Sequence, residues 1–176
     1  MQSIKKLSSS TYSICLIIGA FSLITLGGEL ITNQTSVRAS EKQPNEIYER
    51  GSQVMPFDQN ITKHTFMPNS NGGVQTVTAN DSSDSEQIKL IRSHLKEEAE
   101  KFEQGDFSDP AAIHGEDMPG LAELQAGADR VDVQYNELPD GANLVYSSRD
   151  SEMITALHQW FKAQNKDHNG HENMNH

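Results

Sequence analysis

The sequence predicts an α+β fold, with an antiparallel sheet of about four strands and two main helices on one face. Two segments with strand-like alternation each enclose a turn, and each is followed by a segment with helical periodicity. The chain is long enough for one core of modest size once an N-terminal apolar segment is set aside. The only cysteine, Cys15, lies inside that segment, so the fold is expected to form without disulfides.

The first 39 residues have the layout of a cleavable secretory signal. A basic pair at residues 5–6 precedes the apolar run ICLIIGAFSLITL at residues 14–26, and Val37-Arg38-Ala39 provides compact residues before a cut after Ala39. The run is shorter than the ~20 residues that a membrane-spanning helix needs. We therefore expect export to the periplasm or the extracellular space. The alternative is an uncleaved membrane anchor, lengthened by Leu30 and Ile31.

The exported chain is expected to be strongly acidic. The full sequence carries 14 Lys and Arg against 25 Asp and Glu, a formal charge of −11. The signal segment takes away three basic residues and one acidic residue, which leaves a formal charge of −13. Nucleic acid and anionic lipid both need neutralisation by Lys and Arg, so neither is expected as a partner. Contact with a membrane is expected only through the signal segment, if it stays uncleaved.

The chain is expected to divide into a signal peptide (1–39), a polar linker (40–61), a single α+β domain (62–164) and a flexible histidine-bearing tail (165–176). An apolar cluster at residues 54–57 is the point where the linker is expected to dock. The tail sequence DHNGHENMNH is either a solvated end or a loose cation-binding tract.

Within the domain, turn formers divide two hairpins, at PNSNGG and at Pro139-Asp140-Gly141. Capping residues and glycines predict a long helix capped by Asp84 or Ser85, with Gly105 just past its end, and a last helix that starts at Asp150 or Ser151. Short helices are expected at 109–114 and 119–126. The expected core consists of apolar residues at strand and helix spacing: Ile88, Ile91, Leu95, Phe102, Val131, Val133, Leu144, Ile154, Leu157 and Phe161.

The two hairpin–helix units resemble each other. The segment Asp84-Ser85-Glu86-Gln87-Ile88 matches Asp150-Ser151-Glu152-Met153-Ile154 in its capping and apolar positions. One interpretation is an internal ββα–ββα repeat. The other is the general likeness of any two capped amphipathic helices.

Histidine is the residue type that points most clearly to chemistry, because all seven histidines follow residue 63. The segment 105–124, GDFSDPAAIHGEDMPGLAEL, places His114 and Met118 beside several carboxylates. Imidazole, thioether and carboxylate groups are ligands for copper or zinc. The candidate metal ligands are His114, Met118, His64, His158 and His94.

The alternative for this segment is a structural connector with Met118 buried and its acids in solvent. His94 and His158 lie at the edges of their helices' apolar stripes, where hydrogen-bonded histidines are common. Acids such as Glu97, Glu98 and Glu100 are expected on solvated helix faces. The sequence contains neither a Gly-x-Ser-x-Gly elbow nor a phosphate-binding glycine loop, so no catalytic residue is assigned.

Several strings together resemble a family of small exported bacterial proteins. They include Gly105-Asp106-Phe107-Ser108-Asp109-Pro110, Asp117-Met118-Pro119-Gly120-Leu121 and Leu157-His158-x-Trp160-Phe161, and the resemblance covers most of residues 50–168. It implies one coherent exported domain and no particular mechanism. Some members of the family are labelled aspartate carbamoyltransferase, but the Ser-Thr-Arg-Thr-Arg string of that enzyme is absent from this sequence.

Three classes of function remain open. The first is an exported, non-catalytic domain that binds a metal ion, with copper or zinc as candidates, or another small ligand. The second is an envelope or stress interaction module without a ligand. The third is an enzyme. Metal analysis of the purified protein separates the first two classes.

Overall fold

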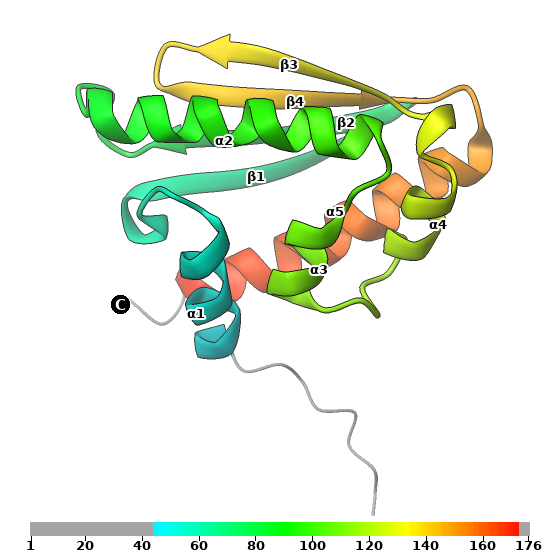
Figure 1. Ribbon diagram of the computed structural model, residues 1–176, viewed down its shortest axis with the longest axis horizontal. Helices are drawn as coiled ribbons and strands as arrows, with labels where there is room; N and C mark the ends of the chain where they lie inside the picture. The colour runs from blue at the N-terminus through cyan, green and yellow to red at the C-terminus, as the bar shows by residue number, and fades with distance from the viewer. Residues whose placement is uncertain (1–43, 173–176) are drawn as a thin grey trace, which may run out of the picture. The chain divides into compact units, whose positions relative to one another are not determined.

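The structure is a computed structural model that describes residues 44–172 (Figure 1). The predicted signal peptide, residues 1–39, and the last four residues, 173–176, lie outside the described residues. The described part forms a four-stranded antiparallel sheet together with helices, so the predicted α+β class is confirmed. No helix in residues 44–172 is long and apolar enough to cross a membrane.

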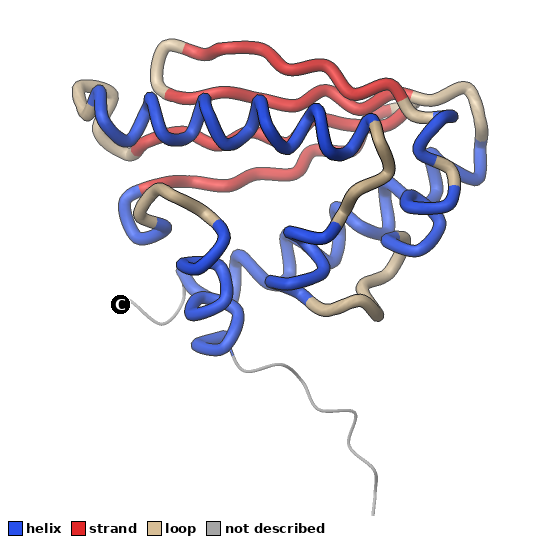
Figure 2. The backbone as a smooth tube through the Cα atoms, viewed as in Figure 1, coloured by secondary structure: helices blue, strands red, loops and turns tan. Residues whose placement is uncertain are grey.

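The sheet is built from two hairpins joined along their inner strands (Figure 2). The first hairpin pairs β1 (Thr62–Asn69) with β2 (Gly72–Ala79), and the second pairs β3 (Asp132–Leu138) with β4 (Gly141–Ser147). The inner strands β2 and β4 are also antiparallel, which gives the order β1-β2-β4-β3. Both hairpins lie where turn formers between alternating segments predicted them.

The two long helices cover one face of this sheet. Each follows a hairpin, so the ββα order occurs twice, with α2 at Ser85–Glu103 and α5 at Ser151–Glu172. The helix α2 packs mainly on β3 and β4, whereas α5 packs on β1 and β2. The ring centroid of Tyr146 on β4 lies 6.3 Å from that of Phe102 in α2 and 5.5 Å from that of Phe161 in α5. One side chain therefore touches both helices, which places them on the same face.

Most of the predicted core is buried, but α5 turns a slightly different arc inward. Met153 is 2% exposed, whereas Ile154, expected in the core, is only half-buried. Val131, also expected there, is half-buried against the core. The inward face of α5 includes Met153, Ala156, Leu157, Trp160, Phe161 and Gln164, and the spacing by three and four residues from Met153 to Leu157, Trp160 and Gln164 keeps these residues on one side of the helix.

Residues 44–61 differ from the expected linker. They form the helix α1 (Pro44–Val54) and the 3-10 helix η1 (Gln59–Ile61), and they bury Ile47, Met55 and Phe57. The docking cluster at 54–57 was predicted, but the helix was not. Apolar residues are sparse in α1, so its buried side is defined by the contacts that it makes with α3 and α5 rather than by a strong periodic pattern.

The predicted flexible tail also differs, because α5 continues to Glu172. The side chain of Asn165 binds the backbone of Phe66: its Nδ2 donates to the carbonyl oxygen at 2.7 Å, and its Oδ1 accepts from the amide at 3.3 Å. In the part of the chain that the structure describes, Phe66 lies on the edge strand β1, which pairs on one side with β2 and has no strand on the other. A polar side chain thus fixes the helix to the sheet edge beyond the point where its apolar residues end.

Two short helices connect the halves, α3 (Ser108–His114) and α4 (Leu121–Ala126), and the 3-10 helix η2 (Ala128–Arg130) follows them. The helix α4 begins two residues later than Pro119, where it was expected. Gly120 precedes it with φ of 83°, a left-handed conformation. A Cβ atom on Gly120 would lie 2.2 Å from the carbonyl oxygen of Ala156, so this glycine allows α4 to pack closely on α5.

Candidate functional site

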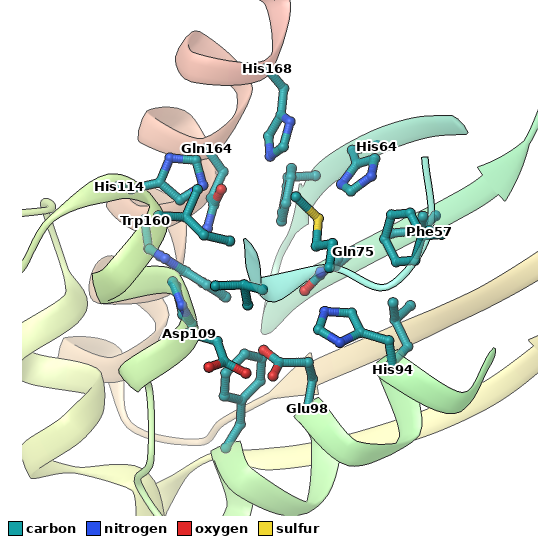
Figure 3. A pocket seen from close by; sticks show the side chains of 18 residues that line it. Phe57, His64, Gln75, His94, Glu98, Asp109, His114, Trp160, Gln164 and His168 are labelled. Atoms are coloured by element: carbon teal, nitrogen blue, oxygen red, sulfur yellow. The ribbon is translucent and has the colours of Figure 1, made fainter. Parts of the chain in front are cut away.

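A cavity of about 50 Å³ lies where α1, β1, β2, α2, α3 and α5 meet (Figure 3). One ordered water needs roughly 10–15 Å³ by this kind of measure, so the cavity has room for a few waters or a very small ligand. Its walls combine imidazole, carboxyl, amide and aromatic groups, which come from His64, His94, His114, His168, Glu98, Asp109, Gln75, Gln164, Phe57, Phe66, Phe102 and Trp160.

A pair of carboxyl groups forms one end of the cavity, with Glu98 from α2 beside Asp109 from α3 (Figure 3). Glu98 is 5% exposed, and it shares a hydrogen bond with Asp109. Burial, followed by this hydrogen bond and the charge of Asp109, raises the pKa of Glu98 to about 9. Glu98 is therefore protonated at neutral pH and donates its proton to Asp109.

Asp109 keeps its negative charge. Burial alone would raise the pKa of Asp109, but hydrogen bonds from Glu98 and Lys101 outweigh it and lower that pKa. Lys101 Nζ lies 2.7 Å from Asp109 Oδ2 and 3.0 Å from Glu97 Oε1. It lies 3.8 Å from Glu98 Oε1, beyond hydrogen-bond distance. At neutral pH this end of the cavity thus holds an ionised Asp109 and a neutral Glu98, and Lys101 pairs with Asp109 and Glu97 beside it.

Histidine rings surround the rest of the cavity (Figure 3). His64 on β1 stacks on His168 of α5 with a centroid distance of 4.7 Å, and His168 meets His114 of α3 edge to face at 5.5 Å. Phe57 stands between His64 and His94, with its ring centroid 5.6 Å from each.

These rings favour the neutral form where a shift is resolved. Burial, and then the proximity of His94 and His114, lowers the pKa of His64 to about 4. Burial also lowers the pKa of His94, although nearby Asp109 and Glu97 oppose the shift. A neutral imidazole offers one N–H donor and one nitrogen lone pair. Each of these two rings can therefore either donate a hydrogen bond to a polar ligand or accept one from it.

His114 is oriented by a carboxylate. Its Nδ1 lies 2.8 Å from Asp167 Oδ2, and the ring is 3% exposed. His114 ends the short helix α3, whereas Asp167 lies near the end of α5, 53 residues further along the chain. The pair therefore joins two elements that both line the cavity.

Buried polar atoms without a hydrogen-bond partner gather at this cavity. Among the described residues, six buried side-chain nitrogen or oxygen atoms lack a partner, and four of them belong to residues that line it. They are His64 Nε2, Glu98 Oε1, Trp160 Nε1 and Gln164 Oε1, and the other two belong to Arg50. Leaving such an atom unpaired typically costs about 1–3 kcal/mol. Water or a polar ligand that hydrogen-bonds to these atoms inside the cavity would remove that cost.

The structure brings together three of the five predicted metal-ligand candidates. His64, His94 and His114 line the cavity, whereas Met118 is 6% exposed within the hydrophobic core. The Nε2 atom of His158 lies 2.9 Å from the carbonyl oxygen of Asn69 and 3.0 Å from that of Gly72. His158 therefore holds the first hairpin turn against α5 and does not reach the cavity.

The histidine and carboxyl side chains at the cavity are also not arranged as a metal centre. Within residues 44–172, no group of three His, Cys, Asp or Glu side chains is placed to hold a metal ion. His64 and His168 stack face to face at 24° instead of directing lone pairs at a common point.

Sequence reasoning missed Glu98, Asp109, Gln164 and His168. Glu98 was expected in solvent, but it lies on the buried arc of α2 between Leu95 and Phe102, where spacing by three and four residues could have indicated it. His168 was assigned to a flexible tail. It is half-buried because α5 extends past Asn165.

Comparison with known proteins adds no relative: no family model, no curated protein and no solved structure matches this chain.

Proposed function

We propose that this chain is an exported, non-catalytic domain that binds a small polar ligand in the histidine-lined cavity. The observation that carries the proposal is the gathering of four unpartnered buried polar atoms around one cavity. Buried polar groups in native proteins are nearly always paired with protein, water or ligand. A ligand that pairs several of these atoms at once would gain affinity from groups that are already desolvated.

The cavity supplies both kinds of hydrogen-bonding group. Trp160 Nε1 can only donate, Gln164 Oε1 can only accept, and the neutral His64 ring can do either at Nε2. Ligand pockets commonly combine apolar walls with a few such convergent polar groups. The volume of about 50 Å³ limits the ligand to a few non-hydrogen atoms.

Copper and zinc remain candidates from the sequence, but the arrangement of the described residues favours a non-metal ligand. Met118 and His158 face elsewhere, and no triad of His, Cys, Asp or Glu in the described part converges on one point. Equilibrium dialysis against copper and zinc, followed by metal analysis, tests the metal alternative directly. Stoichiometric metal that is lost on His114→Ala would favour it over the proposal.

Catalysis is a second candidate because of the Glu98–Asp109 pair. Two carboxyl groups that share a proton can act as acid and base, as in enzymes that hold such pairs in a cleft. Among the described residues that line the cavity there is no serine, threonine, cysteine, lysine or tyrosine, and its histidines and carboxyl groups do not by themselves assign a substrate. Binding without turnover is therefore the function that the geometry supports best.

The single tryptophan of the sequence, Trp160, provides the test, because it lines the cavity. The full chain is titrated with a panel of small neutral, anionic and cationic compounds, and fluorescence and thermal unfolding are recorded. A ligand of the cavity should change the fluorescence saturably and raise the unfolding temperature. The Gln164→Leu variant should weaken the response, whereas Gln159→Leu, on an exposed site of the same helix, should not.

The absence of any saturable response across the panel would count against the proposal. Export is tested separately by the mass of protein recovered from the exported fraction. Cleavage after Ala39 removes residues 1–39, whereas a full-length mass in the membrane fraction would indicate the uncleaved anchor.

A further inference from the structure

Two of the unpartnered buried atoms at the cavity are oxygens that can accept hydrogen bonds, Glu98 Oε1 and Gln164 Oε1. Glu98 donates its only proton to Asp109, so the second oxygen, Oε1, presents a lone pair without a partner. Gln164 Oε1 is a second such acceptor, and the two residues are 5% and 4% exposed. They come from α2 and α5, on different sides of the cavity (Figure 3). A ligand that satisfies both must bring hydrogen-bond donors.

We propose that the ligand is a small organic cation of the ammonium type, bound in exchange for the proton that Glu98 shares with Asp109. The inference rests on the proposed function, since it names the ligand class of the same cavity. An alkylammonium group carries several N–H donors on one atom and fits a cavity that admits a few non-hydrogen atoms.

The local charge supports a cation. Among the described residues, Lys101 is the positive group that contacts the carboxyl pair, and it is already matched by two carboxylates, Asp109 and Glu97. The four side chains Lys101, Asp109, Glu97 and Glu98 together have a formal charge of −1 while Glu98 is protonated, and of −2 once Glu98 is ionised. A bound cation would neutralise the second negative charge, which burial otherwise opposes.

The walls support an organic cation over a metal ion. The aromatic rings of Phe57, Phe66, Phe102 and Trp160 line the same space. Ring faces attract ammonium groups, and they also accommodate the attached methyl or methylene groups. A transition metal would instead need several converging ligands, which the described residues do not provide.

The proton balance is simple. The protonated Glu98 carboxyl and the free cation give the Glu98 carboxylate, the bound cation and one proton released to solvent. No bond to carbon changes and no electron is transferred. Because Glu98 is protonated up to a pH of about 9 in the free protein, cation binding at neutral pH should release about one proton.

The groups around Glu98 allow this proton to be assigned. His94 on α2 has a lowered pKa, and Glu97 and Asp109 are carboxylates that pair with Lys101. The pKa of Lys101 is raised chiefly by its hydrogen bond to Asp109, and burial raises that of Tyr146 on β4 well above its ordinary value. Between pH 7 and 9, Glu98 is therefore the member of this group expected to change its protonation on binding.

The experiment titrates the full chain with methylammonium chloride and follows both Trp160 fluorescence and proton release in weakly buffered solution. Potassium chloride controls for ionic strength, and methanol serves as the neutral compound of similar size. We expect saturable binding of methylammonium alone, release of about one proton per cation, and an affinity that rises about tenfold per pH unit from pH 7 toward 9.

Variants make the result specific to Glu98. In Glu98→Gln, proton release should vanish and the affinity should become independent of pH, with at least about a tenfold loss at pH 9. Glu100→Gln, an exposed acid on the same helix, should bind as the unmodified chain does. Gln164→Leu should weaken binding but keep the pH slope, so it tests the site even if Glu98→Gln fails to fold.

The outcomes separate this inference from the proposed function. Methylammonium binding without proton release, or binding of a neutral, anionic or metal ligand in its place, would overturn the cation-exchange inference and leave a ligand-binding cavity. If no compound in the panel binds, both fail.

Discussion

His114 and Asp167 are joined by an interaction of 2.8 Å between Nδ1 and Oδ2, which ties the end of α3 to the end of α5. The same stretch of α5 carries Gln164 and His168, and both line the cavity. Residues 164–168 of α5 are therefore part of the candidate site. This connection also explains why His114 can be almost fully buried without losing a polar partner.

We expect Asp167→Ala to lower the free energy of unfolding by about 1–3 kcal/mol, because it leaves a buried ring nitrogen of His114 without this carboxylate. Asp167→Asn keeps an acceptor oxygen at the same place and should cost less. Denaturant unfolding measures the difference. The exposed neighbour Lys166→Ala serves as the control, and equal effects of Asp167→Ala and Lys166→Ala would contradict the assigned role.

Stability should fall at alkaline pH because of Glu98. Its pKa is about 9 in the folded protein against 4.5 ordinarily, so the folded state holds a proton that the unfolded state releases between these values. The stabilisation is full below pH 4.5 and is lost as pH rises toward 9, with a slope of about 1 kcal/mol per pH unit. Unfolding measured from pH 6 to 9 should show this slope in the unmodified chain.

The Glu98→Gln variant should flatten that slope, since a glutamine has no proton to lose. Glu100→Gln is the matched control and should retain the slope. If all three proteins lose stability alike between pH 6 and 9, the effect comes from other groups and Glu98 is not held protonated.

In the acidic range the sign is opposite for His64. Its pKa is about 4 in the folded protein against 6.5 ordinarily, so the unfolded state takes up a proton that the folded state resists. The stabilisation is full above pH 6.5 and is lost as pH falls toward 4. His64→Gln should remove this part of the acid sensitivity, as measured by unfolding midpoints from pH 7 to 4. An unchanged profile in His64→Gln, matching that of the exposed-site variant Lys63→Gln, would show that His64 titrates normally.

Leu157→Ala tests the core where α5 meets the sheet. Leu157 is fully buried, and deletion of a buried leucine side chain typically costs about 2–5 kcal/mol. Gln159→Ala, on the exposed side of the same helix, should change stability by less than about 0.5 kcal/mol. A loss as small as this for Leu157→Ala would place the residue outside the core.

Local patterns predicted the elements with strong periodicity or clear turn chemistry. Both hairpins, α2 and the start of α5 follow from alternation, capping residues and glycines, and most of the expected core residues are buried. The segment α1 could not be predicted in this way, because its apolar positions are few and gain their meaning from α3 and α5. The end of α5 was missed because Asn165 holds it through backbone hydrogen bonds, which no apolar pattern records.

The candidate site was predictable only in part. The sequence singled out His64, His94 and His114, and the fold brings all three to one cavity. The sequence also suggested Met118, which lies close to His114 and carries a thioether, and His158, which carries an imidazole. In the structure Met118 packs in the core and His158 binds the first hairpin turn. Glu98 was misplaced because a carboxylate within a charged helix is normally solvated.

By itself, the sequence determined the α+β class, the order of the hairpins and long helices, and the acidic, histidine-bearing character of the domain. These properties depend on neighbours along the chain and on total composition. Only the tertiary structure decided that Glu98 is buried against Asp109 and that His168 faces His64. Protonation states and cavities arise from groups far apart in sequence that share a desolvated space, and that proximity is created by the packing of α2, α3 and α5 on the sheet.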